Sequence, residues 1–298
     1  MRKVLAAADI GSNTLHLLVA EANGKGLKRM VNESEWLSLG EVVAKEGAIP
    51  PALVERLMET LRSFKRLTEA AKAEQLYVFA TEAMRRATNC DQVLEQVQRE
   101  VGLKIELISP RREAELGLRG AMVDTRPHSP HLMVETGGGS VQAAFCRGHE
   151  ITDEVSLRIG TGVLISEGQV TYPVRPSHVD RMKLMIAEAL ETNLAGEYKV
   201  RTMISCGGVA RGIWRAMHPD GNRMLHIEEL QYLIWDASRL DVQTIAARYG
   251  VKAKRAGTLL PGALIYEAFL TRFGIEEFEV SQFGVREGAI LELASREV

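Results

Sequence analysis

The sequence predicts an α/β protein built from two similar domains, and three observations support this fold class. Apolar segments with strand character alternate with segments of helical periodicity along the 298 residues. A stretch rich in proline and polar residues, 124–130, divides the chain. The pattern at the start of the chain returns after this stretch. We therefore expect one domain over 1–124 and a second over 125–298, and leave open whether the final helix packs back on the first domain.

The first half begins with three expected strands and then alternates helices with strands. Asn23-Gly24 is a strong hairpin signal, and Pro50-Pro51 suits the first turn of a helix. The expected strands are 3–10, 14–22, 26–34, 75–81 and 104–108, and the expected helices are 50–73, 91–101 and 111–121.

The second half repeats this arrangement. We expect Ser177 to cap its helix and Pro261 to lie in the first turn of another. The expected strands are 132–136, 140–147, 149–157, 199–205 and 277–281, and the expected helices are 177–195, 208–217, 227–240, 242–249, 260–273 and 285–294. A shift of 126 residues places Asp9 on Glu135, Gly11 on Gly137 and Thr14 on Ser140, which favours a true duplication over chance.

Composition excludes several classes of protein. The 37 basic and 39 acidic residues give a net charge of −2, which argues against binding to a nucleic acid duplex through a strongly basic domain. The three cysteines (Cys90, Cys146 and Cys206) lie far apart without a CxxC pair, so a reducing cytoplasm fits best. No apolar run approaches the length that spans a membrane, and we expect a soluble, cytoplasmic protein.

Three turns that carry glycine follow apolar strands, at 9–14, 135–140 and 205–208. Glycine lets a ligand approach the backbone, and successive N–H groups can hold an anion. Hydroxyls of Ser12, Thr14 and Ser140 add donors, and an acid beside such a turn can hold a divalent cation. Each turn alone fits an ordinary hairpin. The three together favour a phosphate cleft between the halves.

Two further segments carry charged candidates, and the residues leave their roles open. Arg85 follows a buried strand and suits phosphate through its planar guanidinium, whereas Arg86 fits a surface position. Glu113 lies in the first turn of a helix, where an acid usually complements the helix dipole; a general base is the alternative. Arg255 and the pair Arg286-Glu287 are interpreted as surface charges.

Several motifs occur in a fixed order along the chain. They are Asp9-Ile10-Gly11-Ser12-Asn13, the segment 80–89 with Arg85, Ile108-Ser109 with Glu113-Ala114, Gly137–Ser140, Leu260-Pro261-Gly262 and Gly284-x-Arg286-Glu287-Gly288. Over essentially the whole chain, this ordered set resembles the exopolyphosphatase/guanosine pentaphosphate phosphohydrolase (Ppx/GppA) family. The resemblance implies two duplicated actin-like ATPase (ribonuclease H-like) domains around a central phosphate-binding cleft. The length resembles that of the short, two-domain members.

The resemblance also implies roles for individual residues. Glu113 would activate the attacking water, and Arg85 would hold a phosphate of the chain. The phosphate loops would be formed by Gly11, Ser12, Asn13 and Thr14, by Gly137, Gly138, Gly139 and Ser140, and by Gly207 and Gly208. Mg²⁺ or Mn²⁺ would be held by Asp9 and Glu135, with Gln142 as a weak ligand. The substrate would be polyphosphate or guanosine pentaphosphate, and a homodimer is plausible.

Four residues depart from the pattern of the family. Glu135 replaces an aspartate, Gln142 a glutamate, Arg112 an acid and Ser38 an arginine. We expect Gln142 to weaken Mg²⁺ binding, and Arg112 to make Glu113 a weaker base. The leading hypothesis is an exopolyphosphatase, with guanosine pentaphosphate as the alternative substrate. A regulator that binds polyphosphate or guanosine tetra- and pentaphosphate with little catalysis, and a kinase or ATPase of the same superfold, are the other hypotheses.

Overall fold

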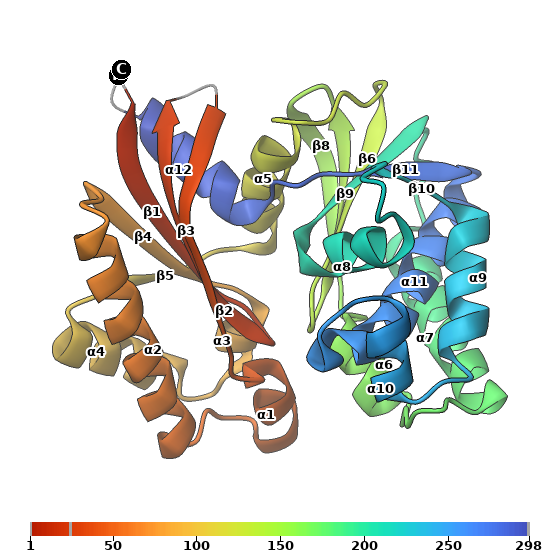
Figure 1. Cartoon of the computed structure of the whole chain (residues 1–298), viewed down its shortest axis with the longest axis horizontal. Helices are drawn as coiled ribbons and strands as arrows, with labels where there is room; N and C mark the ends of the chain where they lie inside the picture. Colours follow the sequence, from red (N-terminus) through yellow and green to blue (C-terminus); the bar gives the residue numbers. More distant parts are fainter. Residues whose placement is uncertain (1, 24–25, 297–298) are drawn as a thin grey trace. The chain divides into compact units, whose positions relative to one another are not determined.

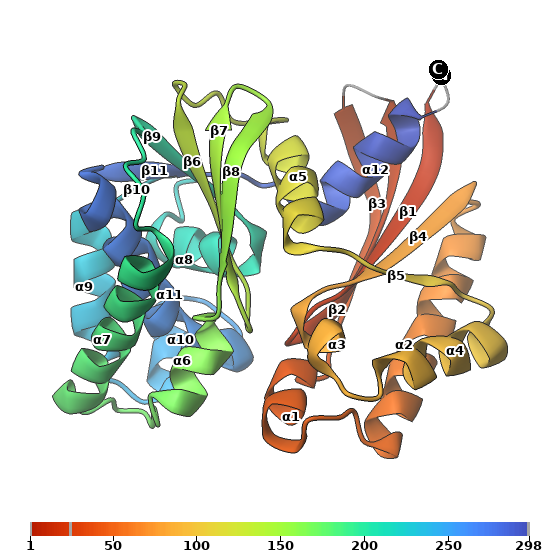
Figure 2. The same cartoon turned by 180° about the vertical axis from the view of Figure 1, so that it is seen from behind.

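The computed structural model describes residues 2–23 and 26–296, and the chain divides into two compact units. Unit 1 holds the residues up to Val123 and those from Phe283 onward, and unit 2 is Asp124–Gln282. The last helix, α12 (Val285–Ser295), therefore belongs to unit 1. The division expected from the sequence placed this helix in the range 125–298 and left its packing open. Figures 1 and 2 show the two units from opposite sides.

Unit 1 contains a five-stranded mixed sheet in the order β3-β2-β1-β4-β5. The first three strands form an antiparallel meander, and β4 and β5 run parallel to β1. Gly24 of the predicted hairpin lies outside the described residues. The strands are β1 (Lys3–Ile10), β2 (Thr14–Asn23), β3 (Gly26–Trp36), β4 (Gln75–Ala80) and β5 (Ile105–Leu107).

Helices cover both faces of this sheet (Figure 1). Alternate residues of β1 pack into the hydrophobic cores on the two faces of the sheet, because successive side chains of a strand point to opposite faces. Ala6 and Ala8 pack with α1 to α4, whereas Leu5 and Ala7 pack with α5 and α12. The helices are α1 (Leu39–Glu46), α2 (Pro51–Ala70), α3 (Glu82–Arg86), α4 (Cys90–Val101), α5 (Pro110–Ala121) and α12.

The backbones of α5 and α12 approach each other closely because glycine lies at their contact. A Cβ atom at Gly288 would lie 1.9 Å from the carbonyl oxygen of Leu116, and one at Gly120 would lie 2.1 Å from that of Gly284. Neither position has space for a side chain. These glycines therefore fix α12 against the first half of the chain.

We expect Gly288→Ala to destabilise unit 1 by about 3 kcal/mol or more, because the added methyl group must push two helix backbones apart. Urea denaturation measures the effect. Gly26→Ala is the matched control, since a Cβ atom there meets nothing within 4 Å. An unchanged midpoint for Gly288→Ala would contradict the close contact.

Unit 2 contains a six-stranded sheet in the order β10-β11-β9-β6-β7-β8. β6, β7 and β8 form an antiparallel meander, and β9 and β11 run parallel to β6. The strands are β6 (His131–Thr136), β7 (Val141–Arg147), β8 (Glu150–Leu157), β9 (Thr202–Cys206), β10 (Met224–His226) and β11 (Glu277–Val280). The helices are α6 (Thr161–Glu167), α7 (Pro176–Asn193), α8 (Gly207–Met217), α9 (Ile227–Ala237), α10 (Val242–Arg248) and α11 (Ala253–Phe273).

Two predictions about helix starts are wrong. α7 begins at Pro176 with Arg175 as its N-cap, so Ser177 lies inside the helix and does not cap it. Proline suits the first helical position, and Pro176 takes that place. α11 begins at Ala253, which puts Pro261 in the helix interior and not in its first turn.

The interior proline of α11 is accommodated by a side chain from outside the helix. Pro261 has no N–H, so it cannot donate to the carbonyl of Gly257 four residues earlier. The hydroxyl of Tyr172 donates to this carbonyl oxygen at 2.9 Å and replaces the missing helix bond. Burial raises the pKa of Tyr172, which keeps its proton available for donation.

We expect Tyr172→Phe to lower the free energy of unfolding by roughly 1–3 kcal/mol, because the carbonyl of Gly257 then lacks a partner. Thermal denaturation compared with Tyr232→Phe provides the measurement. Tyr232 is 51% exposed, and its hydroxyl makes no hydrogen bond within the described part of the chain. Equal melting temperatures for the two variants would mean that the bond to Gly257 contributes nothing.

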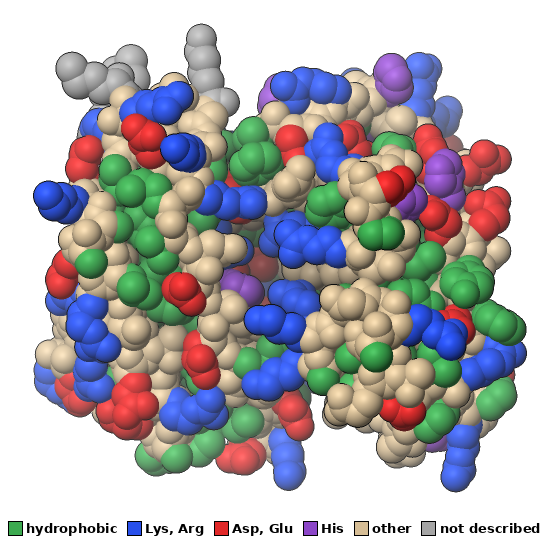
Figure 3. Space-filling view, viewed as in Figure 1, with side chains coloured by type: hydrophobic (Ala, Val, Ile, Leu, Met, Phe, Trp, Pro, Cys, Tyr) green, Lys and Arg blue, Asp and Glu red, His purple; other side chains and the backbone are tan. Residues whose placement is uncertain are grey.

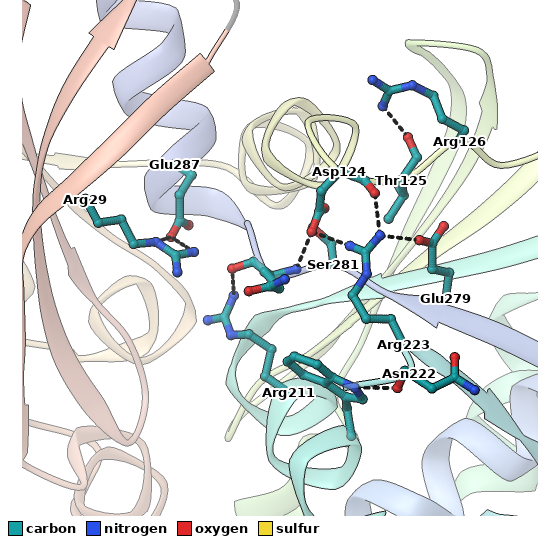
Figure 4. Close-up of polar contacts among 12 residues, drawn as sticks. Arg29, Asp124, Thr125, Arg126, Arg211, Asn222, Arg223, Glu279, Ser281 and Glu287 are labelled. Carbon is teal, nitrogen blue, oxygen red and sulfur yellow. Dashed lines mark hydrogen bonds and ion pairs between the residues drawn. The ribbon is translucent and has the colours of Figure 1, made fainter. Parts of the chain in front are cut away.

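The first and last segments of unit 2 are joined by a polar network (Figure 4). The carboxylate of Asp124 accepts hydrogen bonds from Ser281 Oγ at 2.5 Å and from the backbone N–H of Gln282 at 3.0 Å. Arg223 pairs with Asp124 and also with Glu279, at 2.7 Å. These contacts tie the point where the chain enters unit 2 to the point where it leaves.

The two sheets repeat one topology. The order β8-β7-β6-β9-β11 of unit 2 matches β3-β2-β1-β4-β5 of unit 1, and β10 is an addition at one edge. This is the strand order of the ribonuclease H-like domain, and it confirms the duplication predicted from the acid–x–Gly turns. Within the described residues, no helix has both the length and the apolar character needed to cross a membrane.

Candidate functional site

The β1–β2 turn of unit 1, residues 11–14 (the first loop), directs its carbonyl groups toward α1. The carbonyl oxygen of Ser12 accepts from the N–H of Gly40 at 2.7 Å, and that of Asn13 accepts from Leu37 and Ser38, both at 3.0 Å. The N–H groups of Ser12 and Asn13 make no hydrogen bond within the described residues. Unpaired, adjacent N–H groups of this kind form an anion-binding nest.

Ser38 contributes to this loop through its backbone. Its side chain accepts a hydrogen bond from the indole N–H of Trp36 at 2.8 Å. The position where an arginine is usual in the family is therefore used here for a local turn. α1, which the sequence did not predict, starts at this turn and supports the loop.

Asp9 is the second-last residue of β1, and Ile10 separates it from the first loop. Its Oδ1 atom is buried without a hydrogen-bond partner. Burial raises the pKa of Asp9 to about 6, and the guanidinium of Arg286 opposes this rise. Arg286 comes from α12 and is held by Asn32 Oδ1 at 2.9 Å. Burial disfavours the charged carboxylate of Asp9, and a bound cation would stabilise that charged form.

The interpretation of Arg286 and Glu287 as surface charges is wrong, because α12 is buried in unit 1. Their exposed fractions are only 8% and 2%. Glu287 accepts from Arg29 at 2.7 Å (Figure 4). It also accepts from the backbone N–H of Gly284 at 2.9 Å. The motif therefore places one arginine toward Asp9 and uses the glutamate to fix the start of the helix.

Arg85 and Glu113 lie beside each other at the ends of neighbouring strands. Arg85, on α3, donates to the carbonyl oxygen of Ile108 at 2.5 Å, and its Nη1 lies 3.7 Å from Oε2 of Glu113. Glu113 is on α5, with 15% of its side chain exposed. α3 also contacts the first loop, since Ser12 Oγ donates to Glu82 at 3.3 Å. The ends of β1, β4 and β5 thus bring the candidates of unit 1 together, as expected for parallel strands.

The predicted effect of Arg112 on Glu113 does not follow from this geometry. Arg112 pairs with Glu292 of α12 and lies 3.7 Å from Glu115. These carboxylates compensate its charge and direct the side chain along α5 and α12. The guanidinium that faces Glu113 belongs to Arg85.

The β6–β7 turn of unit 2, residues 137–140 (the second loop), repeats the arrangement of the first. The carbonyl oxygens of Gly137, Gly138 and Gly139 accept from the start of α6, at 3.0, 2.8 and 3.2 Å for the donors Thr161, Gly162 and Gly160. The N–H groups of Gly138, Gly139 and Ser140 make no hydrogen bond within the described residues. Each unit therefore has one loop with adjacent backbone N–H groups that make no hydrogen bond within the described residues.

The residues predicted to hold a cation in unit 2 lie next to the second loop. Glu135 is the second-last residue of β6 and pairs across the sheet with Gln142. The carboxylate of Glu135 lies against Gly207, where a Cβ atom would be 3.0 Å from Oε1 and where φ is +87°. Oε1 of Gln142 is buried without a hydrogen-bond partner.

Arg255 was interpreted as a surface charge, but it lies at the third glycine turn. It is half-buried, and its Nη1 donates to the carbonyl oxygen of Gly208 at 2.9 Å. Burial, together with the charges of Arg211 and Arg215 on α8, lowers the pKa of Arg255. Figure 3 shows Lys and Arg side chains over this part of unit 2. No local pattern joins residues 211, 215 and 255; only the packing of α8 on α11 brings them together.

Comparison with known protein families shows which family has this arrangement of loops and charged residues. The model of the Ppx/GppA phosphatase family matches residues 18–297. The chain belongs to this family. It is accordingly a phosphohydrolase of the type that acts on phosphoanhydride bonds. The resemblance seen in the ordered motifs is confirmed.

Individual relatives carry two kinds of name. Exopolyphosphatase 1 of Mycobacterium tuberculosis is 29% identical, over 96% of this chain and 87% of its own length. Guanosine-5'-triphosphate,3'-diphosphate pyrophosphatase of Aeromonas hydrophila is 24% identical, over 96% of this chain and 58% of its own length. The structure of the Ppx/GppA family member of Aquifex aeolicus has a TM-score of 0.86 and 25% identity, and covers 100% of this chain and 99% of that one.

Proposed function

We propose that this chain is an exopolyphosphatase, which releases the terminal phosphate of inorganic polyphosphate by attack of water. The observation that carries the proposal is the pair of donor loops. In each loop successive carbonyl groups are bound by the segment that begins the next helix, successive N–H groups are left for an anion, and a carboxylate lies near the end of the strand before the loop. Each such loop suits one phosphate group, and polyphosphate is a chain of such groups.

Glu113 is proposed as the general base. Its carboxylate would accept a proton from the attacking water, and Arg85 would hold an oxygen of the terminal phosphate. In the free protein Nη1 of Arg85 lies 3.7 Å from Oε2 of Glu113, so the two side chains are close enough to act on one phosphate group and the water that attacks it.

The donor loops would stabilise the charge that develops on the phosphate oxygens. Their N–H groups are already oriented by bonds to α1 and α6, so they need little reorganisation during the reaction. Arg255 would add a positive charge at the third turn, where it already contacts Gly208. These groups would bind and orient the substrate.

A divalent cation, Mg²⁺ or Mn²⁺, is also proposed. Within the described residues, no three acidic, histidine or cysteine side chains gather at one place. The available ligands are hard oxygens, with Asp9 Oδ1 and Gln142 Oε1 buried without hydrogen-bond partners. This set fits Mg²⁺, which is usually held by one or two carboxylates and substrate phosphates. In unit 1 Asp9 would be a ligand for such an ion, and in unit 2 Glu135 would be one, with Gln142 as a neutral ligand; the ion would neutralise phosphate charge.

Phosphate release by the purified protein tests the proposal. Tripolyphosphate, long-chain polyphosphate and guanosine pentaphosphate are offered with Mg²⁺ or Mn²⁺. We expect release from polyphosphate. Release from guanosine pentaphosphate alone would favour the function named for the Aeromonas relative. Tight binding of these compounds without release would favour the regulator, for which Gln142 in place of an acid is the specific observation.

A further inference from the structure

Gln142 makes contacts that suggest a role other than cation binding. The residue is buried on β7, between Glu135 of β6 and Ser156 of the edge strand β8. Its Nε2 donates to Ser156 Oγ at 3.0 Å and to Ser140 Oγ at 3.3 Å. Both protons of the amide are therefore used, and the last residue of the second loop is tied to the neighbouring strands.

The direction of these bonds determines what the hydroxyl of Ser140 can do. A hydroxyl carries one proton and two lone pairs. Because Ser140 Oγ accepts from Gln142, its own proton remains available for donation. Within the described residues, this hydroxyl donates to no acceptor. It lies on the loop whose N–H groups at Gly138 and Gly139 are also available.

We infer that Gln142 is a positioning residue, which acts through Ser140 to make the second loop a site of hydrogen-bond donors only for a phosphate group of the substrate. The inference rests on the proposed function, since it assumes a phosphate chain as the ligand. The amide holds the serine oxygen through a lone pair, so the serine proton faces the phosphate. Phosphate oxygens accept hydrogen bonds from such a set without meeting a lone pair.

A carboxylate at position 142 would have the opposite effect on the hydroxyl. A carboxylate only accepts hydrogen bonds, so the proton of Ser140 would turn toward it and a lone pair would face the phosphate. The added negative charge would also repel the substrate unless a cation compensated it. The neutral amide thus favours phosphate binding that depends little on a cation in unit 2.

A double-variant cycle tests the inference. Binding of tripolyphosphate is measured by calorimetry in EDTA, and KM and kcat for phosphate release are measured with Mg²⁺. We expect Gln142→Met and Ser140→Ala each to weaken binding in EDTA about tenfold, with a matching rise in KM. The double variant should bind no more weakly than Ser140→Ala, because Gln142 acts through that hydroxyl.

Two more variants make the result decisive. Gln243→Met makes the same change at an exposed position of α10 and should bind like wild type. Gln142→Glu keeps the size of the side chain, covers the case in which Gln142→Met does not fold, and should bind at least tenfold more weakly in EDTA.

The outcomes separate this inference from the proposed function. Additive losses in the cycle overturn the inference. Wild-type binding by either Gln142→Met or Gln142→Glu also overturns it. If the wild-type protein neither binds tripolyphosphate nor releases phosphate from it, the proposed function itself fails. If it releases phosphate but binds too weakly for calorimetry in EDTA, the cycle on KM gives the same decision.

Discussion

Glu113→Gln is expected to lower kcat for phosphate release by about 10²–10⁴-fold, the usual contribution of a general base. The amide keeps the shape of the side chain but cannot take a proton from water. KM should change little, because in the proposed function the donor loops and Arg85 would bind the phosphate groups, and Arg85 keeps its bond to the carbonyl oxygen of Ile108. The loss would therefore lie in the chemical step.

Steady-state kinetics with tripolyphosphate measure this effect. Glu115→Gln is the matched control, since Glu115 lies on the same helix with 43% of its side chain exposed and pairs with Arg111. We expect this control to turn over substrate at the wild-type rate. A kcat for Glu113→Gln within about threefold of wild type would exclude Glu113 as the base, and the base would then have to be sought among other groups of unit 1.

The sequence predicts most elements whose residues have a clear hydrophobic period. α2 has buried residues at Leu53, Leu57 and Leu61, and this spacing is visible without a structure. The short helices α1 and α6 were missed because segments of 8 and 7 residues are too short to show a clear helical period, and both begin near glycine. The full length of α11 was missed since Pro261 suggests a helix start, whereas the hydroxyl of Tyr172 allows the helix to continue.

In the candidate site, too, the backbone loops could be predicted from the sequence, whereas the directions of the long side chains could not. Glycine turns after strands are a local signal, and the loops at 11–14 and 137–140 lie where their pattern predicts. Directions of long side chains are set by tertiary packing, which no local pattern contains. Arg112 turns to Glu292 of the last helix, and Arg286 reaches Asp9 from a helix almost at the end of the chain. The effect of a charged substitution near a motif therefore cannot be predicted until the ion-pair partners of the new side chain are known.

A buried carboxylate at the end of a strand is costly to the free protein, and Asp9 shows this cost in its pKa. The value of about 6 in the folded chain exceeds the ordinary 3.8, so folding favours the protonated form. Stability from this group is complete below pH 3.8 and is lost as pH rises to about 6. At pH 7 to 8 the ionised group opposes folding, and a bound cation would remove the penalty.

Asp9→Asn is accordingly expected to change stability and activity in opposite directions. In EDTA at pH 7.5, the variant should be more stable than wild type by up to about 3 kcal/mol, and the difference should vanish near pH 4. Its kcat/KM with Mg²⁺ should fall by about 100-fold or more, because an amide holds the cation poorly.

Urea denaturation across this pH range, together with kinetics, measures both effects. Asp180→Asn is the control, since Asp180 is exposed on α7 and its loss should change neither property. If Asp9→Asn is less stable than wild type at pH 7.5, the attraction between Arg286 and the carboxylate of Asp9 contributes more to stability than the burial of the charge costs. Opposite changes would instead identify Asp9 as a residue that is retained for binding at the expense of stability.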